Sequence, residues 1–148
     1  MKLPKDSKEL LRLFDANKVD YVIVGAFAVA FHGRPRFTGD LDILLATSDD
    51  NARRVLKSLR EFGFGALGVT VEDLTHPDRI VQLGVAPNRI DLITSLTGIS
   101  NEEVWKGRVR GELDALQVWF VGLSELIRNK RATGRPQDLA DAESLDKP

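Results

Sequence analysis

The stretch TGDLDIL, residues 38–44, carries the sharpest signal in the chain. Asp40 and Asp42 alternate there with the apolar residues Leu41 and Ile43. Side chains two residues apart in a strand point to the same face, with Cα atoms about 6–7 Å apart. The pattern therefore predicts a strand at residues 41–45 that buries its apolar side chains and presents two carboxylates on the opposite face. Such a pair suits Mg²⁺, which prefers carboxylate and phosphate oxygens, but Asp-x-Asp is also common turn and cap chemistry.

A strand-to-helix turn precedes this stretch. Residues 19–24 are mostly β-branched or aromatic and predict a strand, which Gly25 ends. Residues 26–31 are rich in alanine and predict a short buried helix. A glycine at such a turn allows a phosphate to approach the free N–H groups at the positive end of the helix. A tight turn with positive φ requires glycine as well, so both interpretations stay open.

A lone carboxylate lies further along the chain. Residues 89–94 (RIDLIT) predict a strand in which Asp91 is the one acid. A carboxylate in the middle of a strand must be exposed, paired or bound to metal, because burying it bare is costly. Asp91 is therefore either a metal ligand or the partner of a neighbouring arginine. Residues 80–85 predict another strand, joined to this one in a hairpin by a turn at residues 86–88.

The remaining segments complete the predicted fold. Apolar periodicity predicts a strand at 116–121 and helices at 6–17, 49–62, 100–106, 123–132 and 136–145. Asp6 or Ser7 is the expected cap of the first helix, and Ser100 with Glu103 forms a capping box. We therefore expect a single domain, residues 1–148, of α/β (α+β) class with a small mixed β-sheet flanked by helices.

Composition narrows the function classes. The chain has no cysteine, which excludes disulfides, thiolate metal sites and a cysteine nucleophile. No apolar run approaches the ~18 residues of a membrane span, and the start lacks the apolar stretch of a secretory signal, so we expect a cytoplasmic protein. The net charge of −1 argues against a general nucleic-acid binder and leaves only a local basic patch. That patch comprises Arg128, Lys130, Arg131 and Arg135.

Taken together, these features resemble a known superfamily. Gly25-Ala26, the Asp40-x-Asp42 pair and Asp91 resemble the Gly-Gly/Ser…Asp-x-Asp motif and third carboxylate of the nucleotidyltransferase superfamily. Ala26 departs from the Gly or Ser that is common there, and alanine cannot offer a hydroxyl to a phosphate. The resemblance implies a nucleotidyltransferase fold and an enzyme.

A second motif is similar to one particular group. Residues 32–42 (HGRPRFTGDLD) resemble the His-Gly-x-x-Arg-x-Thr-x-Asp-h-Asp pattern, with h apolar, of small bacterial AbiEii-like proteins related to toxin–antitoxin nucleotidyltransferases. Lys130 and residues 135–141 (RPQDLAD) resemble their Lys…Arg-x-Lys-Asp-x-x-Asp motif, with Gln137 in place of the lysine. The resemblance covers roughly residues 20–145.

The resemblance implies a mechanism. Two Mg²⁺ ions would lie between Asp40, Asp42, Asp91 and the triphosphate of an NTP such as ATP. Asp91 would be nearest the acceptor hydroxyl. The remaining implied contacts to the nucleotide come from Gly25 and Ala26, whose amides would bind phosphate, and from Lys130 and Arg36, which would neutralise developing charge.

Simpler roles stay open for several of these residues. A salt bridge with Asp40 explains Arg36 as well as a phosphate contact does. Lys130 is also compatible with an ordinary solvated helix face. Asp138 and Asp141 lie three residues apart on one helix face, where pairing with a nearby arginine explains them as well as a site role does. His32 is expected to cap the end of a helix, and His76 is assigned no role. Trp105 and Trp119 are expected to be core or interface anchors.

The implied function is transfer of a nucleoside monophosphate from an NTP to a hydroxyl of RNA (tRNA), a protein or a small molecule. The chain is close to a bare catalytic core in size, so a partner protein or a homodimer is expected to supply acceptor contacts. The alternative is a catalytically silent nucleotidyltransferase-fold protein that acts as an antitoxin or partner-binding module. Ala26 and Gln137 motivate that alternative, and retention of three acids opposes it.

Overall fold

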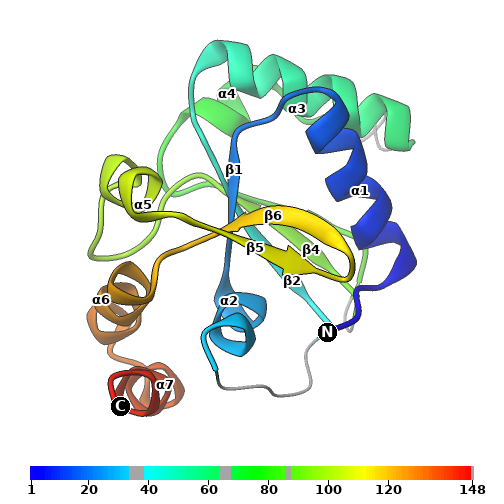
Figure 1. Ribbon diagram of the computed structural model, residues 1–148. Coiled ribbons are helices and arrows are strands. Elements are labelled where there is room, and N and C mark those ends of the chain that lie inside the picture. Colours follow the sequence, from blue (N-terminus) through cyan, green and yellow to red (C-terminus); the bar gives the residue numbers. More distant parts are fainter. Residues whose placement is uncertain (34–38, 64–67, 86–87, 148) are drawn as a thin grey trace.

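The computed structural model describes residues 1–33, 39–63, 68–85 and 88–147. Helices and strands are interspersed along these residues (Figure 1). In chain order they are α1 (Lys5–Ala16), β1 (Tyr21–Val24), α2 (Gly25–Phe31), β2 (Leu41–Leu45), α3 (Asp49–Phe62), α4 (Val71–Thr75), β3 (Ile80–Leu83), β4 (Ile90–Ile93), α5 (Asn101–Gly107), β5 (Val109–Leu113), β6 (Leu116–Phe120), α6 (Leu123–Thr133) and α7 (Pro136–Leu145). The part of the chain that the structure describes contains no helix long and apolar enough to cross a membrane.

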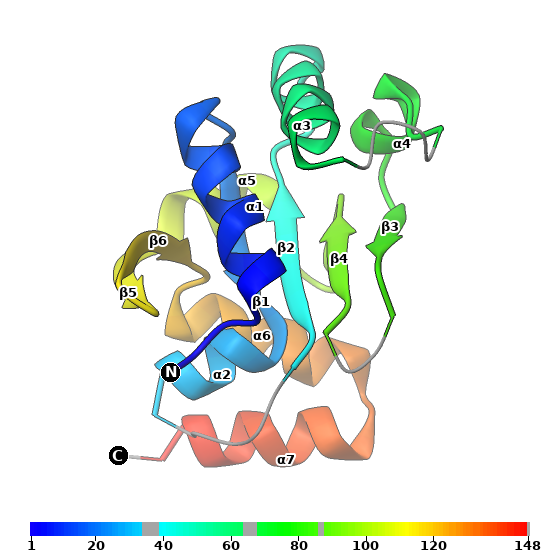
Figure 2. The same cartoon turned by 90° about the vertical axis from the view of Figure 1, so that its right-hand side faces the viewer.

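The strands form one mixed sheet in the order β3-β4-β2-β1-β6-β5. β2 pairs antiparallel with β1 and parallel with β4. β2 and β4 therefore lie side by side and run in the same direction (Figure 2). β1 and β6 pair in parallel, while the hairpins β3–β4 and β5–β6 are antiparallel. Helices flank the sheet, which confirms the predicted fold class.

The two faces of the sheet follow the alternation in β2. Leu41 and Ile43 are fully buried, as predicted. Their face includes Tyr21, the register partner of Leu45, and Phe14 of α1 packs against Tyr21 with 5.8 Å between the ring centroids. Asp42 lies on the opposite face, toward the side of the sheet where α5 and α6 lie.

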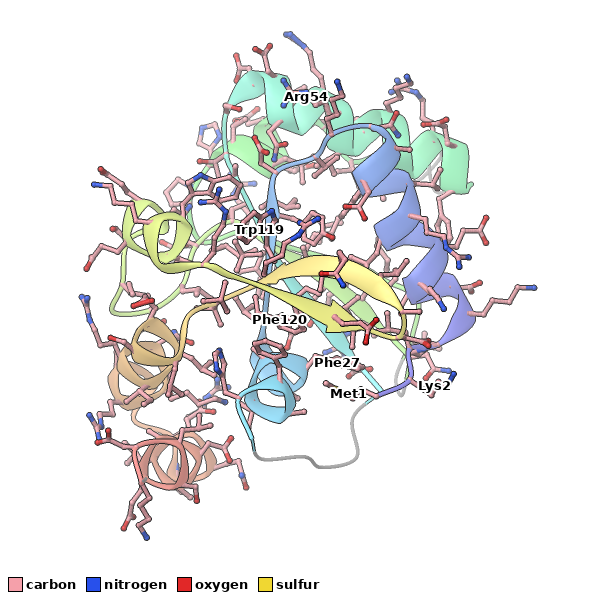
Figure 3. All side chains as sticks on the ribbon, in the orientation of Figure 1. Met1, Lys2, Phe27, Arg54, Trp119 and Phe120 are labelled. Atoms are coloured by element: carbon pink, nitrogen blue, oxygen red, sulfur yellow. The ribbon has the colours of Figure 1, made fainter. Side chains whose placement is uncertain are left out.

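Aromatic packing fixes the position of α2. Phe31 of α2 stacks on Phe120 of β6, with ring centroids 4.0 Å apart and planes within 5° of parallel. Phe27 and Phe120 are buried between the helix and the sheet (Figure 3). The helix is therefore held at the end of β1 by apolar contacts that its alanine-rich sequence led us to expect.

Most predicted elements are confirmed, and the bounds of β2 and α3 match the prediction. β5 and α4 were missed. β5 reads RGE at its centre and lacks apolar alternation, and its turn to β6 uses Asp114 and Ala115, both with positive φ, instead of the Asn-Gly that typically marks such a hairpin. The expected cap of α1 was wrong, because Pro4 occupies that position without a side-chain cap. Residues 86 and 87 of the predicted β3–β4 turn lie outside the described residues.

Candidate active site

Parallel pairing of β2 and β4 brings two of the predicted carboxylates together. Asp42 and Asp91 are direct partners in the register; Asp91 is buried and Asp42 is half-buried. Burial raises the pKa of Asp42 to about 6, and the charges of Asp91 and Asp40 and a hydrogen bond with Asp91 add to the increase. The site therefore concentrates negative charge in a poorly solvated place, which favours binding of a cation.

Asp40 lies beside this pair, just before β2 begins. Its Oδ1 accepts a hydrogen bond of 2.9 Å from the backbone N–H of Arg89, the residue that precedes β4. Its charge contributes to the raised pKa of Asp42. The structure thus brings all three predicted acids, Asp40, Asp42 and Asp91, into one cluster.

Arg89 is the residue of this cluster that the sequence interpretation did not single out as a site residue. Its Nε donates to Asp91 Oδ1 at 2.8 Å, and its Nη2 donates to Asp91 Oδ2 at 3.2 Å. The same Nη2 lies 3.9 Å from Asp40 Oδ2. The alternative that Asp91 pairs with a neighbouring arginine is therefore what the structure shows. The signal was present, because residues two apart in an extended chain share a face.

Gly25 sits directly against Asp42. Its φ is +68°, a conformation that favours glycine. A Cβ atom at this position would overlap the Asp42 carboxylate. Glycine is thus required both by the turn from β1 to α2 and by the close approach of a carboxylate to the backbone.

A cleft of about 390 Å³ joins the carboxylate cluster to the C-terminal helices. Gly25, Ala26 and Asp42 line one side, and Lys130 of α6 lines another. The volume is in the range of ordinary small-ligand sites, about 300–1,000 Å³. The cleft therefore brings four predicted site residues together, whereas Arg36, the remaining predicted nucleotide contact, lies outside the described residues.

Lys130 is buried in a network of charges at the wall of the cleft. Its side chain is 9% exposed, and its Nζ lies 3.0 Å from Asp138 Oδ1 and 3.3 Å from Asp141 Oδ2. Thr133 donates a hydrogen bond of 2.7 Å to Asp138. Burial raises the pKa of Asp138, but the hydrogen bonds from Thr133 and Lys130 outweigh it, and the net result is a lowered pKa. The solvated-face interpretation of Lys130 is therefore wrong, and its ammonium already has two carboxylate partners.

The same region explains the basic patch and Gln137. Gln137 Nε2 donates a hydrogen bond of 3.0 Å to Asp141 Oδ1, so this departure from the motif still contacts the network. Each basic residue of the patch lies within 4 Å of an acidic partner, the pairs being Arg128–Glu103, Lys130–Asp138, Arg131–Asp146 and Arg135–Asp138. These pairs leave little unbalanced charge for a nucleic-acid backbone.

The remaining predicted residues lie outside the cluster. His32 follows the last residue of α2, and its Nε2 is 2.7 Å from the carbonyl oxygen of Val121. His76 Nδ1 is 3.0 Å from the carbonyl oxygen of Glu72. Trp105 and Trp119 are both half-buried, and the guanidinium carbon of Arg108 lies 4.0 and 4.3 Å from the centroids of their rings.

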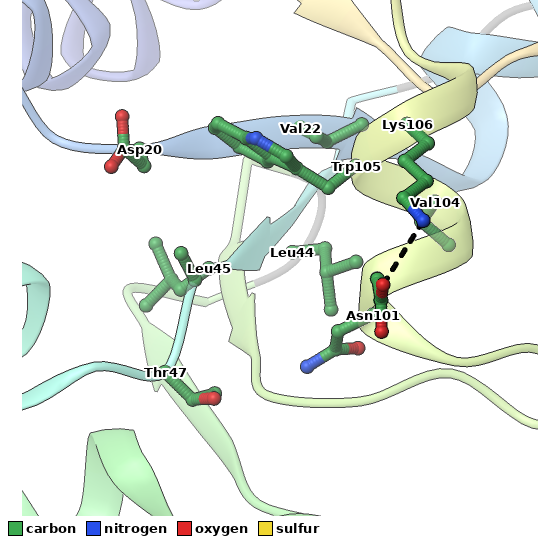
Figure 4. Close-up of a pocket in the computed structure, with 11 residues that line it drawn as sticks. Asp20, Val22, Leu44, Leu45, Thr47, Asn101, Val104, Trp105 and Lys106 are labelled. Atoms are coloured by element: carbon green, nitrogen blue, oxygen red, sulfur yellow. Dashed lines mark ion pairs between the residues drawn. The ribbon is translucent and has the colours of Figure 1, made fainter.

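A second cavity of about 350 Å³ lies on the same face of the sheet, beyond the cleft. Val22, Leu44 and Val104 form its apolar lining with Trp105 (Figure 4). Leu44, which lines this cavity, lies two residues after Asp42 in β2. None of the predicted site residues lines it.

The donor set of the cluster fits Mg²⁺, although it is not arranged as a finished metal site. Asp40, Asp42 and Asp91 supply the oxygen ligands that this ion prefers, and the crowding that raises the pKa of Asp42 is relieved by a divalent cation. Within the described ranges, no group of three or more His, Cys, Asp or Glu side chains already surrounds a common point. Both oxygens of Asp91 face Arg89 instead.

Comparison with known proteins gives one family match. The family model described as "Nucleotidyltransferase of unknown function (DUF6036)" matches residues 2–146. No curated protein matches the sequence.

Several solved structures are similar to the chain in fold. One is a proposed nucleotidyltransferase (TM1012) from Thermotoga maritima, with 14% identity and a TM-score of 0.56 over 97% of this chain and 92% of that one. The lincosamide antibiotic adenylyltransferase LnuA, bound to lincomycin, has 11% identity and a TM-score of 0.57 over 99% of each chain. An antigenic nucleotidyltransferase-like protein from Paracoccidioides brasiliensis has 14% identity and a TM-score of 0.50 over 95% of this chain and 74% of that one. At these identities the likeness is one of fold alone.

Proposed function

The chain belongs to the DUF6036 family of nucleotidyltransferases, because the family model spans nearly all of it, and we propose that it transfers a nucleoside monophosphate from an NTP to an acceptor hydroxyl with the help of Mg²⁺. Its enzyme class and its fold agree with those inferred from the sequence.

One observation carries the proposal. Asp42 and Asp91 face each other across two parallel strands, with Asp40 beside them and the backbone of Gly25 in contact with Asp42. A cluster of three carboxylates costs stability unless a cation compensates it. The adjoining cleft has room for a ligand beside the backbone of Gly25, which no side chain covers.

The residues of the site would divide the reaction between them. Asp40, Asp42 and Asp91 would hold two Mg²⁺ ions, which when bound supply charge stabilisation for the triphosphate and lower the pKa of the acceptor hydroxyl. The acceptor oxygen attacks the α-phosphorus, the bond from that phosphorus to the pyrophosphate oxygen breaks, and the hydroxyl proton passes to a carboxylate. We assign that proton to Asp91, the carboxylate that the motif resemblance implies is nearest the acceptor.

The other cleft residues would bind the nucleotide. At Gly25 the absence of a side chain lets phosphate approach the backbone of the β1–α2 turn, and Ala26 lines the same wall without offering a hydroxyl. Lys130 would contribute positive charge at the opposite wall, reduced by its two carboxylate partners. Arg36 is retained as a proposed phosphate contact on the motif alone.

The acceptor is proposed as a hydroxyl of tRNA or another RNA, of a partner protein or of a small molecule. LnuA, an adenylyltransferase of lincosamide antibiotics by its description, has the same extent as this chain, which is a reason to include small molecules in the acceptor screen. The AbiEii-like, toxin–antitoxin relationship and a homodimer remain proposals of the same kind.

The rival proposal is a silent fold that binds a partner as an antitoxin would. Thermal denaturation with and without Mg-ATP separates the two, because only a protein that binds the nucleotide gains stability from it. Mg-ATP should raise the melting temperature of the wild type but not that of Asp42→Asn.

Label transfer tests the reaction itself. Purified protein is incubated with Mg²⁺, each α-labelled NTP in turn and a host-cell extract freed of small molecules, and the assay is repeated with small-molecule hydroxyl acceptors. Asp42→Asn is the control. Labelling by the wild type alone supports the proposal and identifies the base and the acceptor class, whereas no labelling from folded protein that fails to bind Mg-ATP favours the silent fold.

A further inference from the structure

Arg89 holds the third carboxylate of the cluster by both oxygens. The two nitrogens of the guanidinium lie 2.8 and 3.2 Å from the two oxygens of Asp91, and Nη2 is also 3.9 Å from Asp40. Arginine carries its charge at every pH that a folded protein tolerates, and its planar fork matches a carboxylate. A fixed positive charge therefore lies between two of the three acids.

This position is one that a bound cation would compete for. Mg²⁺ requires nearly octahedral geometry, so its carboxylate ligands have to turn toward it. The fork of Arg89 instead fixes the plane of the Asp91 carboxylate toward the arginine. Among the residues described, the acids do not yet surround a common point.

The side chain of Arg89 has room to leave. It is 32% exposed, whereas the side chain of Asp91 is 12% exposed. The backbone N–H of Arg89 is anchored separately, by its hydrogen bond to Asp40 Oδ1. The guanidinium can therefore move toward solvent or toward an incoming phosphate while the main chain stays in place.

Building on the proposed function, we propose that Arg89 is a positioning residue that stands in for the divalent cation. It holds Asp91 and Asp40 together when metal is absent, and its two hydrogen bonds to Asp91 break when metal and nucleotide bind. Metal affinity in the free protein is lowered accordingly, because each metal-binding event must first displace an arginine. The released guanidinium is then available to the phosphates.

Binding of Mn²⁺, followed through the electron paramagnetic resonance of the free ion, tests this role. Arg89→Lys keeps the charge but loses the fork, so it should bind Mn²⁺ at least about fivefold more tightly than the wild type, and Arg89→Gln more tightly still. If charge alone mattered, Arg89→Lys would match the wild type. Arg79→Lys is the matched control, since Arg79 pairs with Asp73 away from the cluster and its replacement should leave the affinity unchanged.

The arginine can also be observed directly. Its Nε–H resonance, identified by its loss in Arg89→Lys, should move toward the position of a free arginine as Mg-ATP is added. A resonance that stays unchanged at saturating Mg-ATP would overturn the proposal.

The outcomes separate this inference from the function it rests on. Equal Mn²⁺ affinity of the wild type and Arg89→Lys, together with active nucleotidyl transfer, overturns the role of Arg89 and leaves the proposed function intact. Tighter binding by the variants without transfer by the wild type supports the role of Arg89 and counts against the proposed reaction. Absence of Mn²⁺ binding in all the proteins overturns both.

Discussion

Replacing Asp42 with asparagine is expected to stabilise the metal-free protein. The pKa of Asp42 is raised from 3.8 to about 6 by burial and by the neighbouring charges of Asp91 and Asp40. A tenfold change in proton affinity corresponds to about 1.4 kcal/mol, so ionising Asp42 in the folded chain costs on the order of 3 kcal/mol. Asparagine has nearly the same shape and carries no charge, so it avoids this cost.

The sign of the pH dependence follows from the raised pKa. Below about pH 4 Asp42 is protonated in the folded and unfolded states alike, and the two proteins should have similar stability. As the pH rises from about 4 to about 6, the free energy of unfolding of the wild type falls relative to the variant, and above that range the difference is constant.

Urea denaturation in EDTA at pH 4, 5, 6 and 8 measures this difference. At pH 8 the variant should be more stable by about 2–3 kcal/mol, or roughly 5–10 °C in melting temperature for a chain of this length. Excess Mg-ATP should reverse the order, since only the wild type binds it. A stability difference that is independent of pH, or a variant less stable at pH 8, would refute the assignment of a strained carboxylate cluster.

Three further predictions concern the residues around the cleft. Gly25→Ala should abolish transfer, because the added Cβ meets Asp42. It should also lower the free energy of unfolding by more than the ~1–3 kcal/mol of an ordinary positive-φ substitution. Gly134→Ala, at a positive-φ position with open space around it, is the control in thermal denaturation. Lys130→Met should cost about 3 kcal/mol or more in urea denaturation at pH 7, since it removes the buried cation that Asp138 and Asp141 share, and adding Asp138→Asn should recover part of the loss. Asp138 has a lowered pKa, so its contribution to stability is present above its ordinary pKa and is lost as the pH falls through the lowered value. Between pH 7 and pH 3 the melting temperature should therefore fall less steeply in Asp138→Asn than in the wild type.

The sequence was sufficient to predict the strand that carries the acids. Alternation of Leu41 and Ile43 with two aspartates identifies β2 and its buried face, because period two is a local property of the chain. The lone Asp91 in an apolar strand was identified in the same way. That Asp42 and Asp91 face each other depends on parallel pairing of strands far apart in the chain, and spacing alone does not determine that register. Here the family resemblance supplied the juxtaposition.

Features that depend on tertiary contacts were not predictable in this way. Local spacing explains why Arg89 pairs with Asp91, but its approach to Asp40 depends on the pairing of β2 with β4. Lys130 has the sequence surroundings of a solvated helix, and its burial results from the packing of α7 on α6, which brings Asp138 to it. The basic residues near the C-terminus form a patch in the sequence and a set of ion pairs in the fold.

The order of the strands has a consequence for synthesis of the chain. β1 lies in the interior of the sheet, yet one of its neighbours, β6, ends at Phe120. While the ribosome is still adding residues before β6, the strand YVIV of β1 has one open edge, although all four of its residues are buried in the finished fold. An apolar edge of this kind is a template for pairing with other chains, so the nascent protein should be most prone to aggregate, and most dependent on chaperones, during that interval.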